Sequence, residues 1–211
     1  MQLLFPQEHR ISFESVQPAP DLRLFPHEPQ GRIMCIQAPR RGLRAIQDNL
    51  AILPVMHARR VYCLDGVNAF NPYPYAQLAR RTGRGIAEVL DLVRVSRAFT
   101  IHQLQEAVER LLPPLTAISP TPLVAVLGLE HLFLEESLPL WERRHVLGRI
   151  LKRLGELKDA GMPVLITFDD VDNGDGHAWA QTIREHAEDL ARLEVSENGT
   201  PRLEWDNRRQ E

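Results

Sequence analysis

Three arginines, Arg40, Arg41 and Arg44, lie close together where the hydrophobic spacing predicts that a helix begins. Guanidinium groups bind phosphates and carboxylates, and the free N–H groups at the start of a helix favour an anion in the same place. The cluster is therefore a candidate site for a phosphate, a DNA backbone or a carboxylate of a partner protein. The alternative is a solvated turn in which the arginines pair with nearby acidic side chains.

Two further segments concentrate charge. The helix expected over residues 139–160 carries six basic side chains, which could follow a phosphate backbone or form a solvated face balanced by neighbouring acids. The loop 169–176 carries four aspartates without a lysine or arginine, so it would repel DNA. It also lacks the distal glutamate of an EF-hand, and we expect no calcium there.

The remaining candidates are aromatic residues and cysteines. Phe70, Tyr73 and Tyr75 flank two prolines, and they could stack on single-stranded bases or form a rigid, partly buried turn. Cys35 and Cys63 lie in apolar runs typical of buried strands, and neither belongs to a metal-type Cys/His spacing. We therefore expect free thiols, no metal site and no cofactor.

Composition limits the class of protein. The 211 residues carry a formal net charge of −3, with 44% hydrophobic and 25% charged residues, as expected for one globular α/β domain. The net charge argues against a surface that coats nucleic acid generally, although a local basic patch is compatible with it. The sequence shows no apolar run of membrane-spanning length and no signal-peptide pattern, so we expect a cytoplasmic protein without a membrane partner.

Apolar runs alternate with helical patterns along most of the chain. Strands are expected at 32–37, 61–65, 93–96, 123–128 and 163–168, and helices at 42–53, 73–82, 86–92, 100–112, 139–160 and 179–190. The helix 100–112 is expected to end at Pro113-Pro114, and a hairpin over 191–205 turns at Asn198-Gly199. This order predicts an α/β fold with a mostly parallel sheet flanked by helices and a C-terminal antiparallel β-hairpin.

From about residue 31 to residue 208, the order of elements and several local strings resemble the RecA/RadA recombinase family. The most telling segment is 79–111, ARRTGRGIAEVLDLVRVSRAFTIHQLQEAVERL, which is similar to the family's stretch between the catalytic-glutamate strand and the Walker B strand. Residues 142–168 resemble the family's long helix and following strand. The resemblance implies a RecA-like, P-loop NTPase-type core domain over 31–208, preceded by an N-terminal arm, residues 1–30.

The resemblance places a degenerate Walker A motif at residues 37–44. A P-loop requires glycines whose backbone surrounds the phosphates, a lysine that reaches them, and a Ser/Thr hydroxyl on Mg²⁺. Here Gln37 replaces the first glycine, Gly42 is retained, Leu43 stands at the lysine position and Arg44 at the hydroxyl position. Leu43 offers no charge to a phosphate, and Arg44 would repel Mg²⁺.

The other catalytic positions implied by the resemblance are also lost. Val67 stands at the position of the glutamate that activates water, and a valine cannot act as a base. Gly128, or Leu127 if the alignment shifts by one residue, stands at the position of the Walker B aspartate. Phosphoryl transfer depends on positioning and charge neutralisation, and these residues supply neither. We therefore expect the protein to be a pseudo-ATPase that neither hydrolyses ATP nor binds it tightly, and not to be an enzyme.

Catalytically inactive relatives within this family keep the fold and its contact surfaces while a partner supplies the ATPase activity. The resemblance therefore implies a non-catalytic accessory protein in DNA repair or recombination that acts by protein binding. The expected partner is a RecA-type ATPase, a repair polymerase or a second copy. Two alternatives stay open: a DNA-binding module that uses Arg40, Arg41, Arg44 and the basic helix, and a regulatory subunit of another RecA-fold motor.

The proline-rich arm is a candidate partner-binding segment. It carries the apolar residues Phe5, Ile11 and Phe13 in a stretch too short to form its own core. Recombinases are similar to one another in using an apolar segment ahead of the core to dock on a neighbouring protomer. By analogy, the arm either packs on its own domain or adds to the sheet edge of a partner.

Overall fold

The computed structural model describes Leu24 and residues 31–115, 118–135, 137–169 and 174–206. Phe5, Ile11 and Phe13 lie outside the described residues, so their expected partner role stays a prediction. Within the arm, Leu24 is buried in the core, with 2% of its surface exposed.

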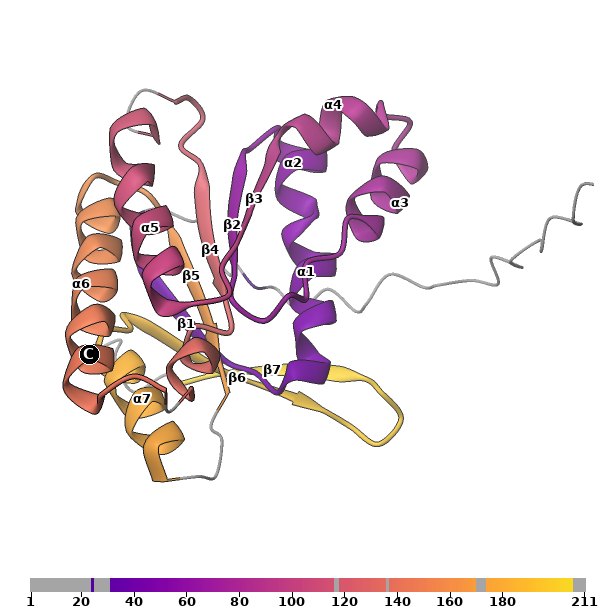
Figure 1. Ribbon diagram of the computed structural model, residues 1–211. Coiled ribbons are helices and arrows are strands. Elements are labelled where there is room, and N and C mark those ends of the chain that lie inside the picture. The colour runs from indigo at the N-terminus through magenta and orange to yellow at the C-terminus, as the bar shows by residue number, and fades with distance from the viewer. Residues whose placement is uncertain (1–23, 25–30, 116–117, 136, 170–173, 207–211) are drawn as a thin grey trace, which may run out of the picture.

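A seven-stranded sheet lies at the centre of the described residues (Figure 1). Its order is β3-β2-β4-β5-β1-β6-β7, and the neighbouring strands from β3 to β6 run parallel. The strands are β1 (Ile33–Gln37), β2 (Val61–Asp65), β3 (Val93–Arg97), β4 (Leu123–Leu127), β5 (Val164–Phe168), β6 (Asp189–Val195) and β7 (Pro201–Trp205). The α/β class, the mostly parallel sheet and the antiparallel C-terminal hairpin are confirmed. Within the hairpin, β6 also pairs parallel with β1, and only β7 runs the other way.

Helices cover both faces of the sheet (Figure 1). One face packs against η1 (Arg40–Gly42), α1 (Leu43–Leu50), α2 (Ile52–His57), α3 (Tyr73–Arg81) and α4 (Ile86–Asp91). The other packs against α5 (Ile101–Leu115), η2 (Glu130–Phe133), α6 (Leu140–Asp159) and α7 (Gly174–Glu185). The central strands β4 and β5 are buried at every residue, which is why their sequences are apolar on both faces.

Three helices differ from the sequence prediction at their ends. The first helix is divided, because Pro54 has no N–H to donate and lies in the first turn of a new helix, α2. Helix α5 continues through the two prolines to Leu115, whose burial in the core stabilises the last turn. Helix α7 begins earlier than expected, at Gly174. It also ends earlier, because residues 189–192 pair with β1 as part of the sheet.

The polar face of α6 is largely neutralised, in agreement with the solvated alternative. Arg149 pairs with Glu109 of α5 at 2.6 Å, Arg153 pairs with Glu156, and Lys158 approaches Glu188 at 3.4 Å. These contacts reduce the positive charge that the helix presents to a phosphate backbone.

Arg143 departs from the expectation of a solvated basic residue, because only 5% of its surface is exposed. Its guanidinium donates to the carbonyl of Phe133 at 2.8 Å and to the carboxylate of Asp175 at 3.1 Å. The same group lies 5.7 Å from the ring centroid of Trp179. Arg143 therefore joins α6 to η2 and α7.

We expect Arg143→Ala to lower the free energy of unfolding by about 2–3 kcal/mol, because the buried carbonyl of Phe133 and the ring of Trp179 lose their partner. The exposed neighbour provides the control, and Arg144→Ala should change stability by less than about 0.5 kcal/mol. Urea denaturation of both variants measures the difference. Equal effects would contradict the structural role of Arg143.

Candidate functional site

The positions assigned to the degenerate nucleotide site meet at the carboxyl edge of the sheet. Gln37 is the last residue of β1, Gly42 ends η1, and Leu43 begins α1. Val67 follows β2 and Gly128 follows β4, which pairs with β2. Parallel strands bring their carboxyl ends to one edge, which is where α/β proteins commonly bind ligands. The edge is therefore the first place to test for chemistry.

Val67 and Gly128 fill the space between the loops after β2 and β4. Gly128 has a φ of +63°, and a Cβ built on it would lie 2.2 Å from Cγ1 of Val67. Val67 is 7% exposed, and its carbonyl accepts a hydrogen bond of 3.1 Å from Nη2 of Arg40. An aspartate at Gly128 would therefore collide with the valine that stands at the glutamate position.

The residues at the P-loop positions have packing roles as well. Leu43 is 3% exposed and belongs to the core, while Arg44 is exposed. A Cβ at Gly42 would lie 2.6 Å from Cδ2 of Leu193, so glycine allows η1 to approach β6. Gln37 accepts a hydrogen bond of 2.9 Å from Arg184 of α7. Gln37, Gly42 and Leu43 each have a contact that accounts for the residue without a nucleotide.

Asp65, at the end of β2, holds the loop that follows it. Its side chain is fully buried and accepts three backbone N–H bonds, from Val67 at 3.3 Å, Ala69 at 3.0 Å and Phe70 at 2.8 Å. Arg97 lies 3.9 Å from the same carboxylate. With its oxygens committed in this way, Asp65 acts as a structural acceptor. This structural role of Asp65 was not predicted from the sequence, although a lone acid at the end of an apolar strand is a signal for it.

Gln47 completes the attachment of this loop to α1. Its side-chain nitrogen donates to the carbonyl of Ala69 at 2.9 Å, and its oxygen accepts from the N–H of Asn71 at 2.7 Å. Gln47 is 2% exposed. The loop after β2 is therefore fixed from two sides, by Asp65 and by Gln47. Sequence reasoning missed Gln47, which carries no motif.

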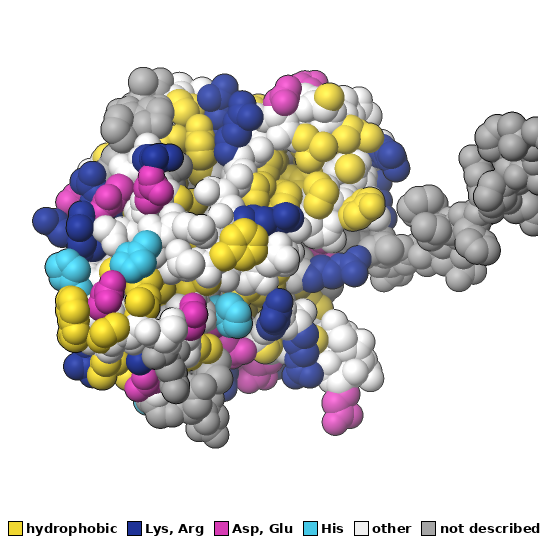
Figure 2. Space-filling model, in the orientation of Figure 1, with side chains coloured by type: hydrophobic (Ala, Val, Ile, Leu, Met, Phe, Trp, Pro, Cys, Tyr) yellow, Lys and Arg dark blue, Asp and Glu magenta, His cyan; other side chains and the backbone are white. Residues whose placement is uncertain are grey.

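Two polar hollows lie at this edge, and both are lined by Arg41 of η1. The larger, of about 590 Å³, lies toward β6 and α7 and is lined by Gln37, Pro39, Arg41, Asp169, His177, Arg192, Leu193, Glu194 and Val195. The smaller, of about 400 Å³, is lined by Arg40, Arg41, Leu43, Arg44, Gln47, Asn68, Ala69, Asn71 and Pro74. Figure 2 shows several Lys and Arg side chains over the start of α1 and the neighbouring β6–β7 hairpin. The larger hollow carries charges of both signs, whereas the smaller carries arginines without a carboxylate.

The aromatic candidates separate into buried and exposed residues. Tyr75 is fully buried, and its ring centroid lies 5.8 Å from that of the half-buried Phe70. Burial raises the pKa of the Tyr75 hydroxyl. Tyr73, by contrast, is 71% exposed. Of these three residues, Tyr73 is the one that can stack on a base, and the other two form the partly buried turn.

Glu130, just after β4, is a buried carboxyl group. It is 4% exposed, and its Oε2 atom has no hydrogen-bond partner among the described residues. Burial raises its pKa to about 7, and the negative charge of Asp169 contributes to the rise, while backbone hydrogen bonds partly offset it. The group therefore titrates near neutral pH, and its anionic form destabilises the fold relative to its protonated form.

The described part of the chain offers little support for metal binding, reactive thiols or a membrane-spanning helix. No group of three or more His, Cys, Asp and Glu side chains there could hold a metal ion. Cys35 and Cys63 are buried thiols outside any disulfide bond, and burial raises the pKa of the Cys63 thiol. No described helix is both long enough and apolar enough to cross a membrane.

No protein-family model matches the chain, and no curated protein matches it at a significant level. Its family is therefore not assigned by similarity, and the resemblance to RecA/RadA recombinases stays a prediction.

Asp65→Ala should lower the free energy of unfolding by at least about 3 kcal/mol, because three backbone N–H groups lose their acceptor and each unsatisfied donor costs about 1–3 kcal/mol. The exposed Asp91 supplies the control, and Asp91→Ala should leave stability within about 0.5 kcal/mol of the parent. Thermal and urea denaturation measure both variants. A mild effect of Asp65→Ala would show that the loop does not depend on this carboxylate.

Glu130→Gln should stabilise the protein above neutral pH. The pKa of Glu130 rises from the ordinary 4.5 to about 7 in the folded state, so the folded state binds more protons than the unfolded state between these values. Stability then falls as the pH rises through this window. Glutamine removes that loss, worth up to about 3 kcal/mol.

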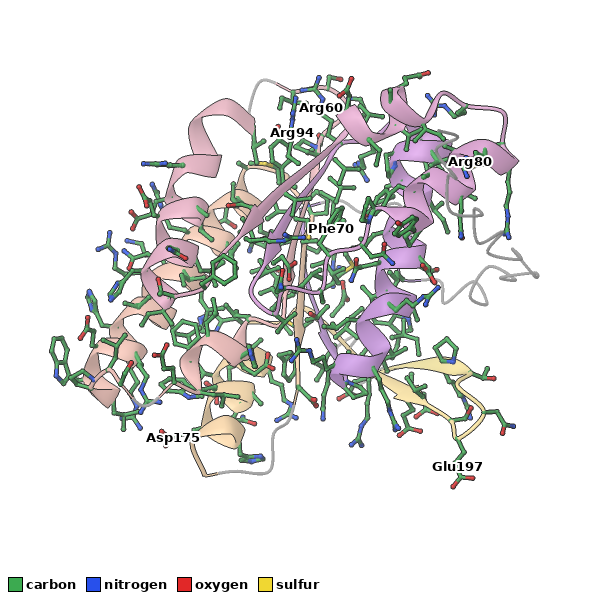
Figure 3. All side chains as sticks on the ribbon, turned by 45° about the vertical axis from the view of Figure 1, so that its right-hand side comes forward. Arg60, Phe70, Arg80, Arg94, Asp175 and Glu197 are labelled. Carbon is green, nitrogen blue, oxygen red and sulfur yellow. The ribbon has the colours of Figure 1, made fainter. Side chains whose placement is uncertain are left out.

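The gain should be present at about pH 8 and nearly absent at about pH 4 and below, as measured by urea denaturation. Glu197→Gln, at the exposed tip of the hairpin (Figure 3), is the control and should show no pH-dependent gain. A constant difference between Glu130→Gln and the parent across this range would contradict the raised pKa.

Proposed function

We propose that the chain is a non-catalytic, RecA-like accessory protein in DNA repair or recombination, which acts by binding another protein. The observation that carries this proposal is the contact between Val67 and Gly128, where the resemblance would place the catalytic glutamate and the metal-binding aspartate. The two residues pack against each other instead of facing an open metal site. This packing at the two implied catalytic positions supports a role in assembly and not in catalysis.

The charges at the edge also oppose ATP chemistry. A P-loop lysine would have to project from the position of Leu43, which is buried in the core. The Mg²⁺-binding hydroxyl is replaced by the cation Arg44. Asp65, the acid closest to the expected catalytic position in the chain, is committed to three backbone N–H groups. These residues supply neither a base nor a metal ligand for phosphoryl transfer.

The exposed edge of β3 is a suitable surface for a protein partner. Among the described strands, β3 pairs only with β2, and four of its five residues are exposed. Val95 is 39% exposed and Phe99, just beyond the strand, is 65% exposed. Arg60 and Arg94 lie together at one end of this edge (Figure 3). An uncovered strand of this kind can accept a strand from another chain.

The direction of the β3 peptide groups allows a specific test. Leu92 accepts from the N–H of Val61, and Ala98 donates to the carbonyl of Asp65. Because a parallel strand alternates the direction of its peptide groups, those of Val95 face away from β2. Val95→Pro therefore removes an outward N–H group and leaves the bonds to β2 intact.

We expect Mg-ATP at about millimolar concentration to leave the melting temperature unchanged, whereas a ligand that binds, present at 100 times its dissociation constant, would raise stability by about 2.7 kcal/mol.

We expect wild-type protein to associate with itself or with a RecA-type ATPase encoded beside it, and Val95→Pro to weaken that association at unchanged melting temperature. Val95→Thr is the matched control and should bind normally. Light scattering and titration calorimetry measure the association.

A Mg²⁺-dependent rise in melting temperature with ATP would contradict the non-catalytic assignment. Full association of Val95→Pro would exclude the β3 edge as the contact surface. Absence of any association by the wild-type protein, with itself or with the ATPase, would contradict the accessory role.

A further inference from the structure

The smaller hollow at the carboxyl edge, which we call the arginine pocket, combines three features of a nucleic-acid site. It has a volume of about 400 Å³ and lies between η1, α1 and the loop after β2. Three arginines line it, together with the side chains of Asn68 and Asn71. The loop that carries the two asparagines is held by Asp65 and Gln47. The pocket is therefore a preorganised surface rather than a loose turn.

The arginines of the pocket are not neutralised by ion pairs. In the described part of the chain, Arg40 donates to the carbonyl of Val67 and Arg41 to that of Val195, and no carboxylate lines the pocket. Asp48, one helical turn after Arg44, feels the charge of Arg44, but its own burial raises its pKa. A guanidinium group carries five N–H donors, so one bond to a carbonyl leaves most of them available. Among the described residues, no ion pair within 4 Å joins Arg40, Arg41 or Arg44 to an acid, and Asp48 is the acid whose charge acts on Arg44.

An exposed aromatic residue belongs to the same stretch of chain as two lining residues of the pocket. Tyr73 lies between Asn71 and Pro74 in the chain, and both of these residues line the arginine pocket. The backbone of Tyr73 is fixed by a hydrogen bond of 3.0 Å from its N–H to the side chain of Asn71. Tyr73 is 71% exposed, so the free chain gains little from burying its ring. Guanidinium groups beside an exposed aromatic ring are the usual elements that bind a phosphate backbone and stack a base.

We propose that the arginine pocket binds single-stranded nucleic acid, with Arg41 and Arg44 on phosphates and Tyr73 stacked on a base. The neutral amides of Asn68 and Asn71 supply further hydrogen-bonding groups. A paired duplex keeps its bases stacked inside, so it cannot offer one to Tyr73. An acidic peptide would satisfy the arginines but would leave the ring unused. The inference goes beyond the accessory role and does not depend on it, since it involves no partner protein.

The test uses the full-length chain and a fluorescein-labelled oligo-dT, with binding followed by fluorescence anisotropy across a series of salt concentrations. Each phosphate contact on a single strand contributes about 0.7 to the slope of log affinity against log salt. Arg41→Gln with Arg44→Gln should therefore reduce the slope by about 1.4. Arg40 is kept because its bond to Val67 supports the loop. The matched control is Arg144→Gln with Lys152→Gln on the exposed face of α6, which removes the same charge and should keep the slope.

Tyr73→Ala separates stacking from charge. It should weaken oligo-dT binding roughly fivefold or more with an unchanged salt slope, and Tyr73→Phe should restore the affinity. Melting temperatures of all variants, expected to match the parent, exclude unfolding as the cause. Absence of oligo-dT binding at low salt would overturn the proposal, as would an unchanged slope in the arginine variant. Poly-glutamate that binds the same arginines as tightly as oligo-dT, with no effect of Tyr73→Ala on oligo-dT, would overturn it in favour of an acidic partner. These results would leave the test of the β3 edge unaffected.

Discussion

The loop at the carboxyl edge of the sheet depends on the hydrogen bonds that the carboxylate of Asp65 accepts from its backbone. A buried acid is costly unless its oxygens are satisfied, and Asp65 is satisfied by the backbone of the loop that follows it. These bonds hold the loop in which Val67 lies against Gly128. It also presents the carbonyl of Val67 to Arg40 and that of Ala69 to Gln47. One side chain therefore holds the loop after β2, which contacts Gly128, Arg40 and Gln47.

The same loop fills the space at the positions where the resemblance would place a catalytic centre. A nucleotide site needs a concave backbone, an open metal position and a base in contact with water. Here Val67 fills the space beside Gly128, which has a positive φ. Gly42 of η1 allows close packing against Leu193. Packing contacts at both glycines therefore occupy space that a nucleotide site would need open.

The edge has nonetheless kept surfaces with unbalanced charge and exposed apolar groups. The arginine pocket lies on the side of α1 and α3, and the β3 edge carries Val95 and Phe99 at the margin of the sheet. These surfaces are built from different elements and differ in chemistry. Backbone pairing at β3 selects a strand of another chain, whereas guanidinium groups and Tyr73 select an anion with an aromatic face. The proposed protein contact and the proposed nucleic-acid contact therefore lie on separate surfaces.

The sequence by itself determined the local elements and the losses at the implied catalytic positions. Strands such as 61–65 and 163–168 are apolar runs, and burial in a parallel sheet imposes that composition, so they could be predicted within about one residue. The absence of a lysine, a base and a metal-binding acid can also be read residue by residue. Only the tertiary structure decided which groups replace them, because hydrogen-bond partners far apart in the chain leave no periodic signal. Arg40 meets Val67, Gln47 meets Asn71, and Arg143 enters the core through contacts with η2 and α7. The parallel pairing of β6 with β1 has the same origin, since hydrophobic alternation reports that a strand is buried and not which neighbour it joins.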